Sequence, residues 1–261
     1  MKLHLDKKVF KEFINKIGIE SNIDLDILEK DYYVCCILKE LSTKQDELQA
    51  YFKGGTAIYK ILDTMNRFSE DIDLTVKRAE GISSTQKKKR FEASAFSYSI
   101  EGLKLNREES NKERESEIAV YEYDSVFTID KEPLQRAGKI QIESTSFTVS
   151  EPIEEAYVEP IIYKIASDKE KEILKKNYEV YPIKLKIIKL ERMFIDKVFA
   201  AEFYNLRKKY TDMAKHIYDI NVLLNNEKIK KLLENKEELT TLIEYKREEE
   251  KYRARRSWFQ Y

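Results

Sequence analysis

The amino-acid sequence predicts an α+β fold in which a mixed sheet is flanked by helices and followed by a helical C-terminal region. Apolar residues recur at helical spacing near both ends of the chain, whereas apolar and polar residues alternate in several segments between them. Of the 261 residues, 42% are hydrophobic, which is enough for a packed core in one large domain or two small ones. No internal repeat or linker is visible, so a boundary near residue 150 is suggested by composition alone.

The N-terminal part is predicted to form helices and then a strand. Helical spacing covers residues 6–17 and 25–41. Two glycines interrupt the pattern just before a helical stretch at 56–62. In residues 71–76 apolar side chains alternate with polar ones, which predicts a strand with both of its aspartates on one face.

The later segments add further strands and end in helices. Strands are expected at 118–129, 139–149 and 180–188, and the first two are expected to pair as neighbours. Helices are expected at 84–103, 189–208 and 211–224, followed by a charged helical tail. Residues 106–117 are rich in Glu, Lys, Arg and Asn, which indicates a solvated connection.

The composition excludes several classes of protein. Lys+Arg and Asp+Glu are equal at 48 each, so no global field marks a general nucleic-acid binder. No apolar run approaches the roughly 20 residues of a membrane span, and the N-terminus lacks a secretory signal, so we expect a cytoplasmic protein. Cys35 and Cys36 are adjacent in a predicted helix, which indicates reduced packing residues. With His4 and His216 as the only histidines, the chemistry is expected to use carboxylates and lysines.

A pair of glycines precedes a predicted helix. At Gly54 and Gly55 the backbone can approach a phosphate closely, and the free N–H groups and dipole of a helix start favour its charge. Thr56 can add a hydroxyl donor, and Ser69 can contact a triphosphate from the turn before the next strand. Taken alone, the glycine pair would more often be a simple turn.

Two carboxylates follow on the predicted strand. Asp71 and Asp73 are two residues apart and point the same way, so they can hold Mg²⁺ or Mn²⁺ together with substrate phosphates. Two ions held there would neutralise a triphosphate and activate an attacking hydroxyl. An Asp-x-Asp pair alone more often belongs to a solvated edge strand, but its position one helix after the glycine pair favours a catalytic site.

The run Lys53–Thr56, followed by Arg67–Leu74, closely resembles the signature of AbiEii-type toxins, which belong to the polymerase-beta-like nucleotidyltransferase superfamily. Glu29–Val34 is similar to the family's helix before the glycine motif. Asp196-Lys197 and Lys215–Ile220 occupy the places of the family's catalytic lysine and last aspartate. The resemblance covers most of the chain, from about residue 25 to 225.

The resemblance implies a polymerase-beta-like nucleotidyltransferase domain. Residues 1–150 would form the N-terminal helices and the core, and residues 151–261 a mostly helical region that contributes to the active-site cleft. The implied reaction uses a divalent metal, an NTP and an RNA acceptor such as the tRNA of the MenT relatives. The implied partner is a cognate antitoxin of a toxin–antitoxin or abortive-infection system that serves in phage defence.

The resemblance also assigns roles on the C-terminal helices. Lys197 would be catalytic and would hold the triphosphate or the leaving pyrophosphate, and Asp219 would orient Lys197 or the acceptor. The family commonly has Glu-Lys where this chain has Asp196-Lys197, and Arg-Asp where it has Lys215-His216. The second difference replaces an acid by a histidine. Without the family pattern, Lys197 would be read as a surface lysine and Asp219 as part of an exposed face.

A third metal ligand is expected from a neighbouring strand. In residues 139–143 the isoleucines share one face, so Glu143 projects from the other face, as Asp71 and Asp73 do on their strand. Since the register between the strands is unknown from sequence, a solvent-facing Glu143 remains an alternative.

Two basic segments, 87–90 and 251–259, could contact RNA, although either could also be ordinary surface or terminus. Two other functions stay open. One is a small-molecule nucleotidyltransferase of the aminoglycoside type, which uses the same glycine and carboxylate chemistry. The other is a non-catalytic nucleotide- or RNA-binding module, which would be expected to lack one aspartate of the pair.

Overall fold

The structure is a computed structural model that describes residues 1–62, 67–77, 81–113, 115–127 and 138–257, with backbone only for 252–257. A short 3₁₀ turn, Leu3–Leu5, comes first. The helices are α1 Lys7–Ser21, α2 Leu25–Leu48, α3 Gly54–Ile61, α4 Ser84–Phe96, α5 Ile161–Ile165, α6 Asp168–Tyr178, α7 Leu190–Leu206, α8 Tyr210–Leu224, α9 Glu227–Glu234 and α10 Lys236–Ser257. The strands are β1 Ala50–Lys53, β2 Ile72–Val76, β3 Leu103–Lys112, β4 Ser116–Tyr123, β5 Lys139–Thr145, β6 Ile153–Val158 and β7 Ile183–Ile188.

The strands of the described chain form a single seven-stranded sheet in the order β3-β4-β5-β2-β1-β7-β6. Strand β1 is parallel to β7, and β2 is parallel to β5, whereas the other neighbours are antiparallel. The sheet is therefore mixed and is flanked by helices, which confirms the predicted fold class. Strands from both sides of residue 150 take part in it.

Helix α2 lies in the centre of the core. All of its residues from Leu28 to Leu38 are buried, and the helix packs against β1, β5 and β7. Cys35 and Cys36 are buried free thiols, as predicted. Helix α4 packs beside α2 and against β2, β4 and β5, so these two helices cover one face of the sheet.

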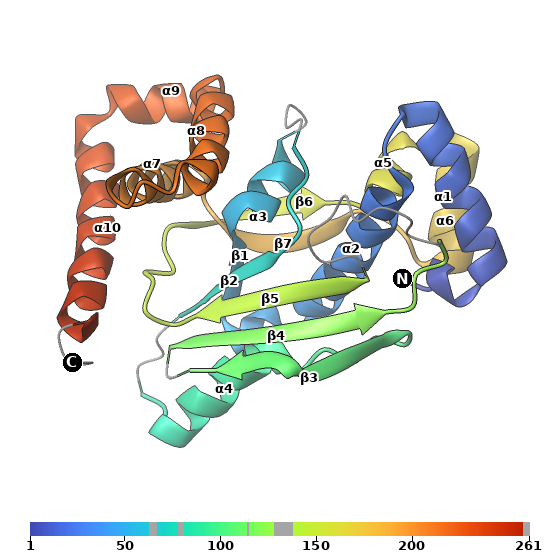
Figure 1. Cartoon of the computed structure of the whole chain (residues 1–261), viewed down its shortest axis with the longest axis horizontal. Helices are drawn as coiled ribbons and strands as arrows, with labels where there is room; N and C mark the ends of the chain where they lie inside the picture. Colours follow the sequence, from blue (N-terminus) through green and yellow to red (C-terminus); the bar gives the residue numbers. More distant parts are fainter. Residues whose placement is uncertain (63–66, 78–80, 114, 128–137, 258–261) are drawn as a thin grey trace.

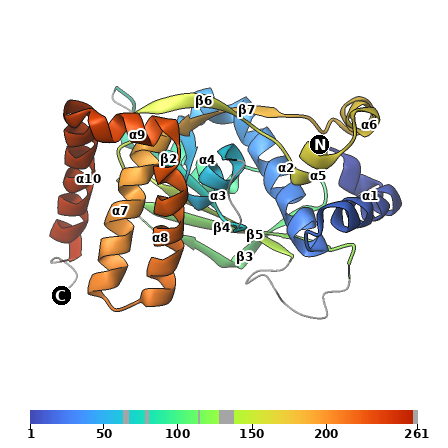
Figure 2. The ribbon, with the colours of Figure 1, turned by 90° about the horizontal axis from the view of Figure 1, so that it is seen from above.

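The C-terminal helices form a group at one end of the molecule. Helices α7 and α8 pack side by side, and α9 and α10 pack against α7 (Figures 1 and 2). Helices α1, α5 and α6 gather at the opposite end around α2, with α3 between the two groups. No helix in the described part of the chain combines the length and the apolar character needed to cross a bilayer.

Several predicted elements need correction. Residues 106–117 are not a solvated connection, because Leu103–Lys112 form the edge strand β3, whose charged side chains are exposed. The helix expected at 84–103 ends at Phe96. Strands β1 and β6 and helices α5 and α6 were not predicted. The charged edge strand has one row of backbone groups open to water, so it needs no apolar alternation.

Candidate active site

A row of charged residues crosses the middle of the sheet. Asp73 of β2 pairs in register with Lys53 of β1 on one side and with Glu143 of β5 on the other. Side chains directly opposite each other on paired strands share a face, so Asp73 and Glu143 project together. Ile140 and Ile142 are fully buried on the opposite face of β5. The alternation in the sequence predicted the face of β5 on which Glu143 lies, and the register between β5 and β2 places Glu143 beside Asp73.

The surroundings of Asp73 change its acidity. Burial, with the nearby charges of Glu143 and Asp71, raises the pKa of Asp73 from 3.8 to about 7, and Lys53 and Lys197 only partly oppose this. Among the described residues, no three His, Cys, Asp or Glu side chains form a ready-made ligand cluster. The Asp73–Glu143 pair nevertheless fits a divalent cation, since oxygen donors whose charges repel are the ligands that Mg²⁺ stabilises.

Gly54 and Gly55 lie where β1 turns into α3, and at each position there is little room for a side chain. Gly54 has a φ of +82°, and a Cβ atom there would collide with the Asp73 carboxylate. A Cβ atom at Gly55 would lie 2.9 Å from both Arg67 Nη2 and Ser69 Oγ, and 3.6 Å from Lys197 Nζ. The backbone of Gly55 is therefore surrounded by three donor side chains at the start of a helix, which is an arrangement suited to an anion.

Asp219 holds two of these donors. It is fully buried on α8 and accepts hydrogen bonds from Arg67 Nε at 2.7 Å and Arg67 Nη2 at 2.6 Å. Its Oδ2 also lies 2.8 Å from Lys197 Nζ of α7. Burial alone would raise the pKa of Asp219, but the hydrogen bond from Arg67 and the charge of Lys197 hold it below its ordinary value. Asp219 thus lies at ion-pair distance from Lys197 while it binds Arg67.

The segment before β2 is fixed by hydrogen bonds to its neighbours. Thr56 Oγ1 donates to the backbone carbonyl of Asp71 and lies 3.0 Å from Ser69 Oγ. Lys30 of α2, whose side chain is fully buried, donates to Glu70 at 2.6 Å. The motif Glu29–Val34 therefore contacts the carboxylate-bearing segment directly.

The remaining residues of the α8 motif divide between the site and the surface. The His216 ring stacks on Tyr204 with centroids 5.3 Å apart, and burial together with Lys197 lowers the pKa of His216 to about 4. The histidine is therefore neutral beside the cations. Asp212 and Lys215 form an exposed pair 3.7 Å apart, so for these two residues the surface interpretation applies.

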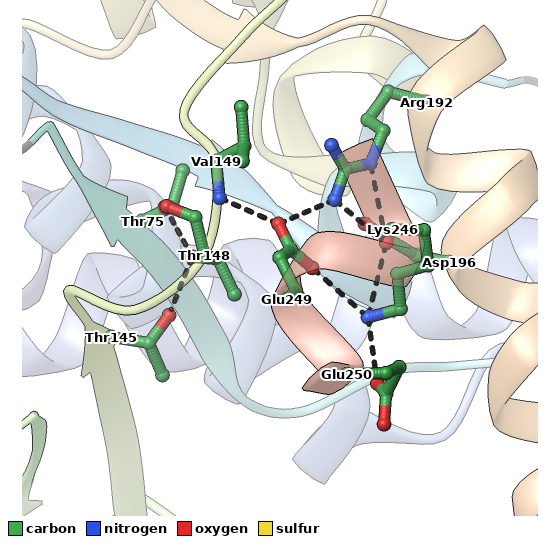
Figure 3. A network of polar contacts seen from close by, with 9 residues as sticks. All are labelled: Thr75, Thr145, Thr148, Val149, Arg192, Asp196, Lys246, Glu249 and Glu250. Carbon is green, nitrogen blue, oxygen red and sulfur yellow. Dashed lines mark hydrogen bonds and ion pairs between the residues drawn. The ribbon is translucent and has the colours of Figure 1, made fainter. Parts of the chain in front are cut away.

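Asp196, which precedes Lys197, faces a different group. It contacts Arg192 at 3.3 Å and Lys246 of α10 at 3.4 Å (Figure 3). Glu249 of α10 lies 2.6 Å from Arg192 Nη2, and both side chains are only 1% exposed. The network attaches α10 to the helix that carries Lys197.

The structure thus brings together Gly54, Gly55, Thr56, Ser69, Asp71, Asp73, Glu143, Lys197 and Asp219. Sequence reasoning assigned no role to Lys53 or Arg67. Arg67 lies within the motif that resembles the family signature. Its contact with Asp219 joins residues 152 positions apart, so local spacing could not predict this contact. Residues 87–90 lie on α4, against the other face of the sheet. Of the basic tail, side chains from 252 onward lie outside the described residues.

Comparisons with solved structures give matches of low identity. A Helicobacter pylori protein, JHP933, has 17% identity and a TM-score of 0.42, with 78% of this chain and 68% of that chain covered. MenT4, the nucleotidyltransferase toxin Rv2826c of Mycobacterium tuberculosis, has 15% identity and a TM-score of 0.43, with 73% and 57% covered. An antigenic nucleotidyltransferase-like protein from Paracoccidioides brasiliensis has 13% identity and a TM-score of 0.36, with 80% and 91% covered. No curated protein matches.

The comparison with protein families gives a match over most of the chain. The family described as "Nucleotidyl transferase AbiEii toxin, Type IV TA system" matches residues 36–260, which include the glycine pair, both strand carboxylates, Lys197 and Asp219. The resemblance noted from the motifs is thereby confirmed, and the protein is a nucleotidyl-transferring enzyme. The chain belongs to the AbiEii family of nucleotidyl transferase toxins from type IV toxin–antitoxin systems.

Proposed function

We propose that this protein is a metal-dependent toxin that transfers a nucleotide from an NTP to RNA, with tRNA as the acceptor. One observation carries the proposal. The carboxylate pair Asp73 and Glu143 shares a sheet face beside the turn at Gly54 and Gly55, where cations surround the start of α3. A polyphosphate and a divalent cation would be bound side by side by such a site.

The cations would bind the donor and the leaving group. In the proposed reaction an acceptor hydroxyl attacks the α-phosphorus of the NTP, and pyrophosphate leaves with the electrons of the broken P–O bond. Arg67 and Lys197 are held by Asp219 at bonding distance, so they are oriented before the substrate arrives. Oriented donors stabilise the developing charge of pyrophosphate without reorganisation. Ser69, Thr56 and the Gly55 backbone would contact the other phosphate oxygens.

The carboxylates would hold the metal. Asp71, Asp73 and Glu143 are the proposed ligands, and the raised pKa of Asp73 supports this because a cation would relieve its repulsion with Glu143. A divalent cation supplies charge neutralisation at the phosphates and activation of the attacking hydroxyl. Lys197 and Asp219 are proposed as catalytic and orienting residues respectively.

The partners follow from the family. The description of a type IV toxin–antitoxin system implies a cognate antitoxin, and nucleotidyl transfer implies an NTP donor. The choice of RNA, and of tRNA within it, is supported by the resemblance to the MenT relatives. A small-molecule acceptor of the aminoglycoside type is the second candidate, since the donor site described above would serve it equally well.

The test is transfer of label from each α-³²P-labelled NTP to total tRNA in the presence of Mg²⁺, with an aminoglycoside mixture as a parallel acceptor. Asp73→Asn removes one proposed ligand. Asp212→Asn is the matched control, because it makes the same change at an exposed aspartate that pairs only with Lys215 among the interactions described. Both variants should fold, which circular dichroism will show.

We expect label on tRNA with the unaltered chain and with Asp212→Asn, and a loss of about a hundredfold or more with Asp73→Asn. Chelation of Mg²⁺ should abolish the label. Label on the aminoglycosides alone would replace the RNA acceptor by a small molecule. Unchanged transfer in Asp73→Asn, or transfer that persists in a chelator, would refute the metal site.

A further inference from the structure

A cavity lies on the face of the sheet opposite the carboxylates. It has a volume of about 730 Å³ and is formed by α4 together with the ends of β2, β3 and β4. Glu117 of β4 lines it and comes just before Ile118, the residue that pairs with Glu143. Since neighbouring residues of a strand point to opposite faces, Glu117 projects away from the active site. The volume lies within the range of small-molecule sites in proteins.

Two buried polar atoms at this cavity lack partners. Glu117 is 4% exposed, and its Oε2 makes no hydrogen bond to any residue that the structure describes. Arg90 also lines the cavity; its Nη1 donates to Gln49 and its Nη2 to the backbone carbonyl of Lys77, whereas its Nε is buried and unpartnered within the described chain. Burying either group without a partner is unfavourable, and such groups in native proteins usually contact a ligand or ordered water. Glu117 Oε2 is a hydrogen-bond acceptor and Arg90 Nε a donor, so a ligand that binds both atoms must carry a donor and an acceptor.

The position of Glu117 is unusual for its strand. The next residues of β4 on the same face, Ala119, Tyr121 and Tyr123, are buried core residues. Burial raises the pKa of Glu117 to about 7, and the charges of Lys112 and Lys88 oppose this only in part. A carboxyl group in this position therefore does not add to the stability of the fold.

Cations outnumber acids around the cavity, where Glu92, which pairs with Lys112, and Glu113 also lie. Lys87 and Lys88 line it from the exposed side of α4, where the charge of Lys88 acts on Glu92 and Glu117. Phe91, one turn further along α4, adds an aromatic, mostly buried wall. Together with Arg90 these lysines favour an anion at the entrance, while the interior offers an apolar surface and the Glu117 acceptor.

We propose that this cavity binds a nucleotide, with the N–H groups of the base at Glu117 and the phosphate at Arg90, Lys87 and Lys88. A base edge supplies the donor that the carboxylate needs, since Glu accepts from exocyclic amino groups. The ring lies against Phe91, and the phosphate meets the cations. The nucleotide is either free NTP or one residue of an RNA chain. The choice of a nucleotide rests on the proposed function, because the enzyme handles nucleotides at its other face.

Photo-crosslinking locates the ligand. The probes are 8-azido-ATP and a short oligoribonucleotide that contains 8-azidoadenosine, each used with the full chain in a chelator and mapped by peptide mass spectrometry. The variants are Glu117→Leu, which removes the acceptor, and Lys87→Ala/Lys88→Ala. The matched control is Lys175→Ala/Lys176→Ala, an equivalent lysine pair on the distant helix α6.

We expect label on α4 or β4, and a loss of about tenfold or more in both variants but not in the α6 control. Label from 8-azido-ATP that free ATP competes away identifies free nucleotide, and label from the oligonucleotide alone identifies RNA. Glu117→Leu should unfold at the same temperature as the unaltered chain or higher, so the loss cannot come from misfolding. Absence of label on both elements, or equal loss in the α6 control, overturns the proposal. No readout requires transfer, so failure of the proposed reaction is detected separately.

Discussion

Replacement of Glu249 by Gln should strongly destabilise the protein. Glu249 Oε1 lies 2.6 Å from Arg192 Nη2 and accepts a hydrogen bond from Val149 N at 2.5 Å, and its Oε2 lies 3.1 Å from Lys246 Nζ (Figure 3). Gln keeps the size of the side chain but not its charge. Arg192, which is 1% exposed, would then have Asp196 at 3.3 Å as the acid that remains among the contacts described.

The expected loss follows from this burial. Removal of one partner from a buried ion pair costs about 3–5 kcal/mol. Here the buried cations Arg192 and Lys246 would have to share the Asp196 carboxylate. For a chain of this size, each kcal/mol lowers the midpoint of thermal unfolding by roughly 2–4 °C, so a decrease of roughly 6–20 °C is expected.

The assay is equilibrium unfolding in urea, followed by circular dichroism at 222 nm. Glu227→Gln is the matched control, because it makes the same change in an exposed pair with Lys230, where the carboxylate is 76% exposed. That pair should contribute less than about 1 kcal/mol. If Glu249→Gln lowers the free energy of unfolding by less than about 1 kcal/mol, with an unchanged slope of that free energy against urea concentration, the Arg192 charge does not depend on Glu249 and the reasoning is refuted.

Three further outcomes are expected at the active site. Asp219→Asn should lower the free energy of unfolding by about 2–4 kcal/mol at pH 7. Because the pKa of Asp219 is lowered in the folded protein, this difference between the two proteins should shrink as the pH falls below 3.8, which unfolding curves at several pH values will show. Asp73→Asn should raise the free energy of unfolding of the metal-free protein by roughly 1–2 kcal/mol in the same assay, since the cost of burying the carboxylate charge and its repulsion with Glu143 disappear, while transfer is lost. Gly54→Ala should abolish transfer because its Cβ displaces Asp73, whereas Gly81→Ala, at a φ of +77° in open space, should carry backbone strain alone and keep transfer.

The fold was predictable where one strand or helix shows its own periodicity. Residues 71–76 alternate cleanly, and β2 was found within one residue of its observed start. The four-residue strand β1 was missed because a segment so short has too few positions to show a period. Strand β3 was missed for a different reason. Its charged side chains are typical of a loop, and its role as an edge strand depends on pairing with β4.

The candidate site was predictable only in part, because it is assembled by pairing between distant segments. Alternation showed which face of β5 carries Glu143, but the parallel register that sets it beside Asp73 joins residues 70 positions apart. The contact of Arg67 with Asp219 likewise depends on how α8 packs. No local pattern encodes such contacts, so only the family resemblance indicated a role for Asp219.

The burial of Asp219 explains how the site can hold cations close together without a substrate. Arg67 and Lys197 would repel each other near Gly55 if nothing lay between them. The Asp219 carboxylate binds both, and the group of three keeps a net charge of +1, from two cations and one anion. That remaining charge, at the start of a helix whose glycine leaves the backbone open, still attracts a phosphate. Because Asp219 comes from α8 and Lys197 from α7, which packs against α3, the proposed anion site requires the C-terminal helices to be in place, so the proposed donor site would form together with the fold of the C-terminal region.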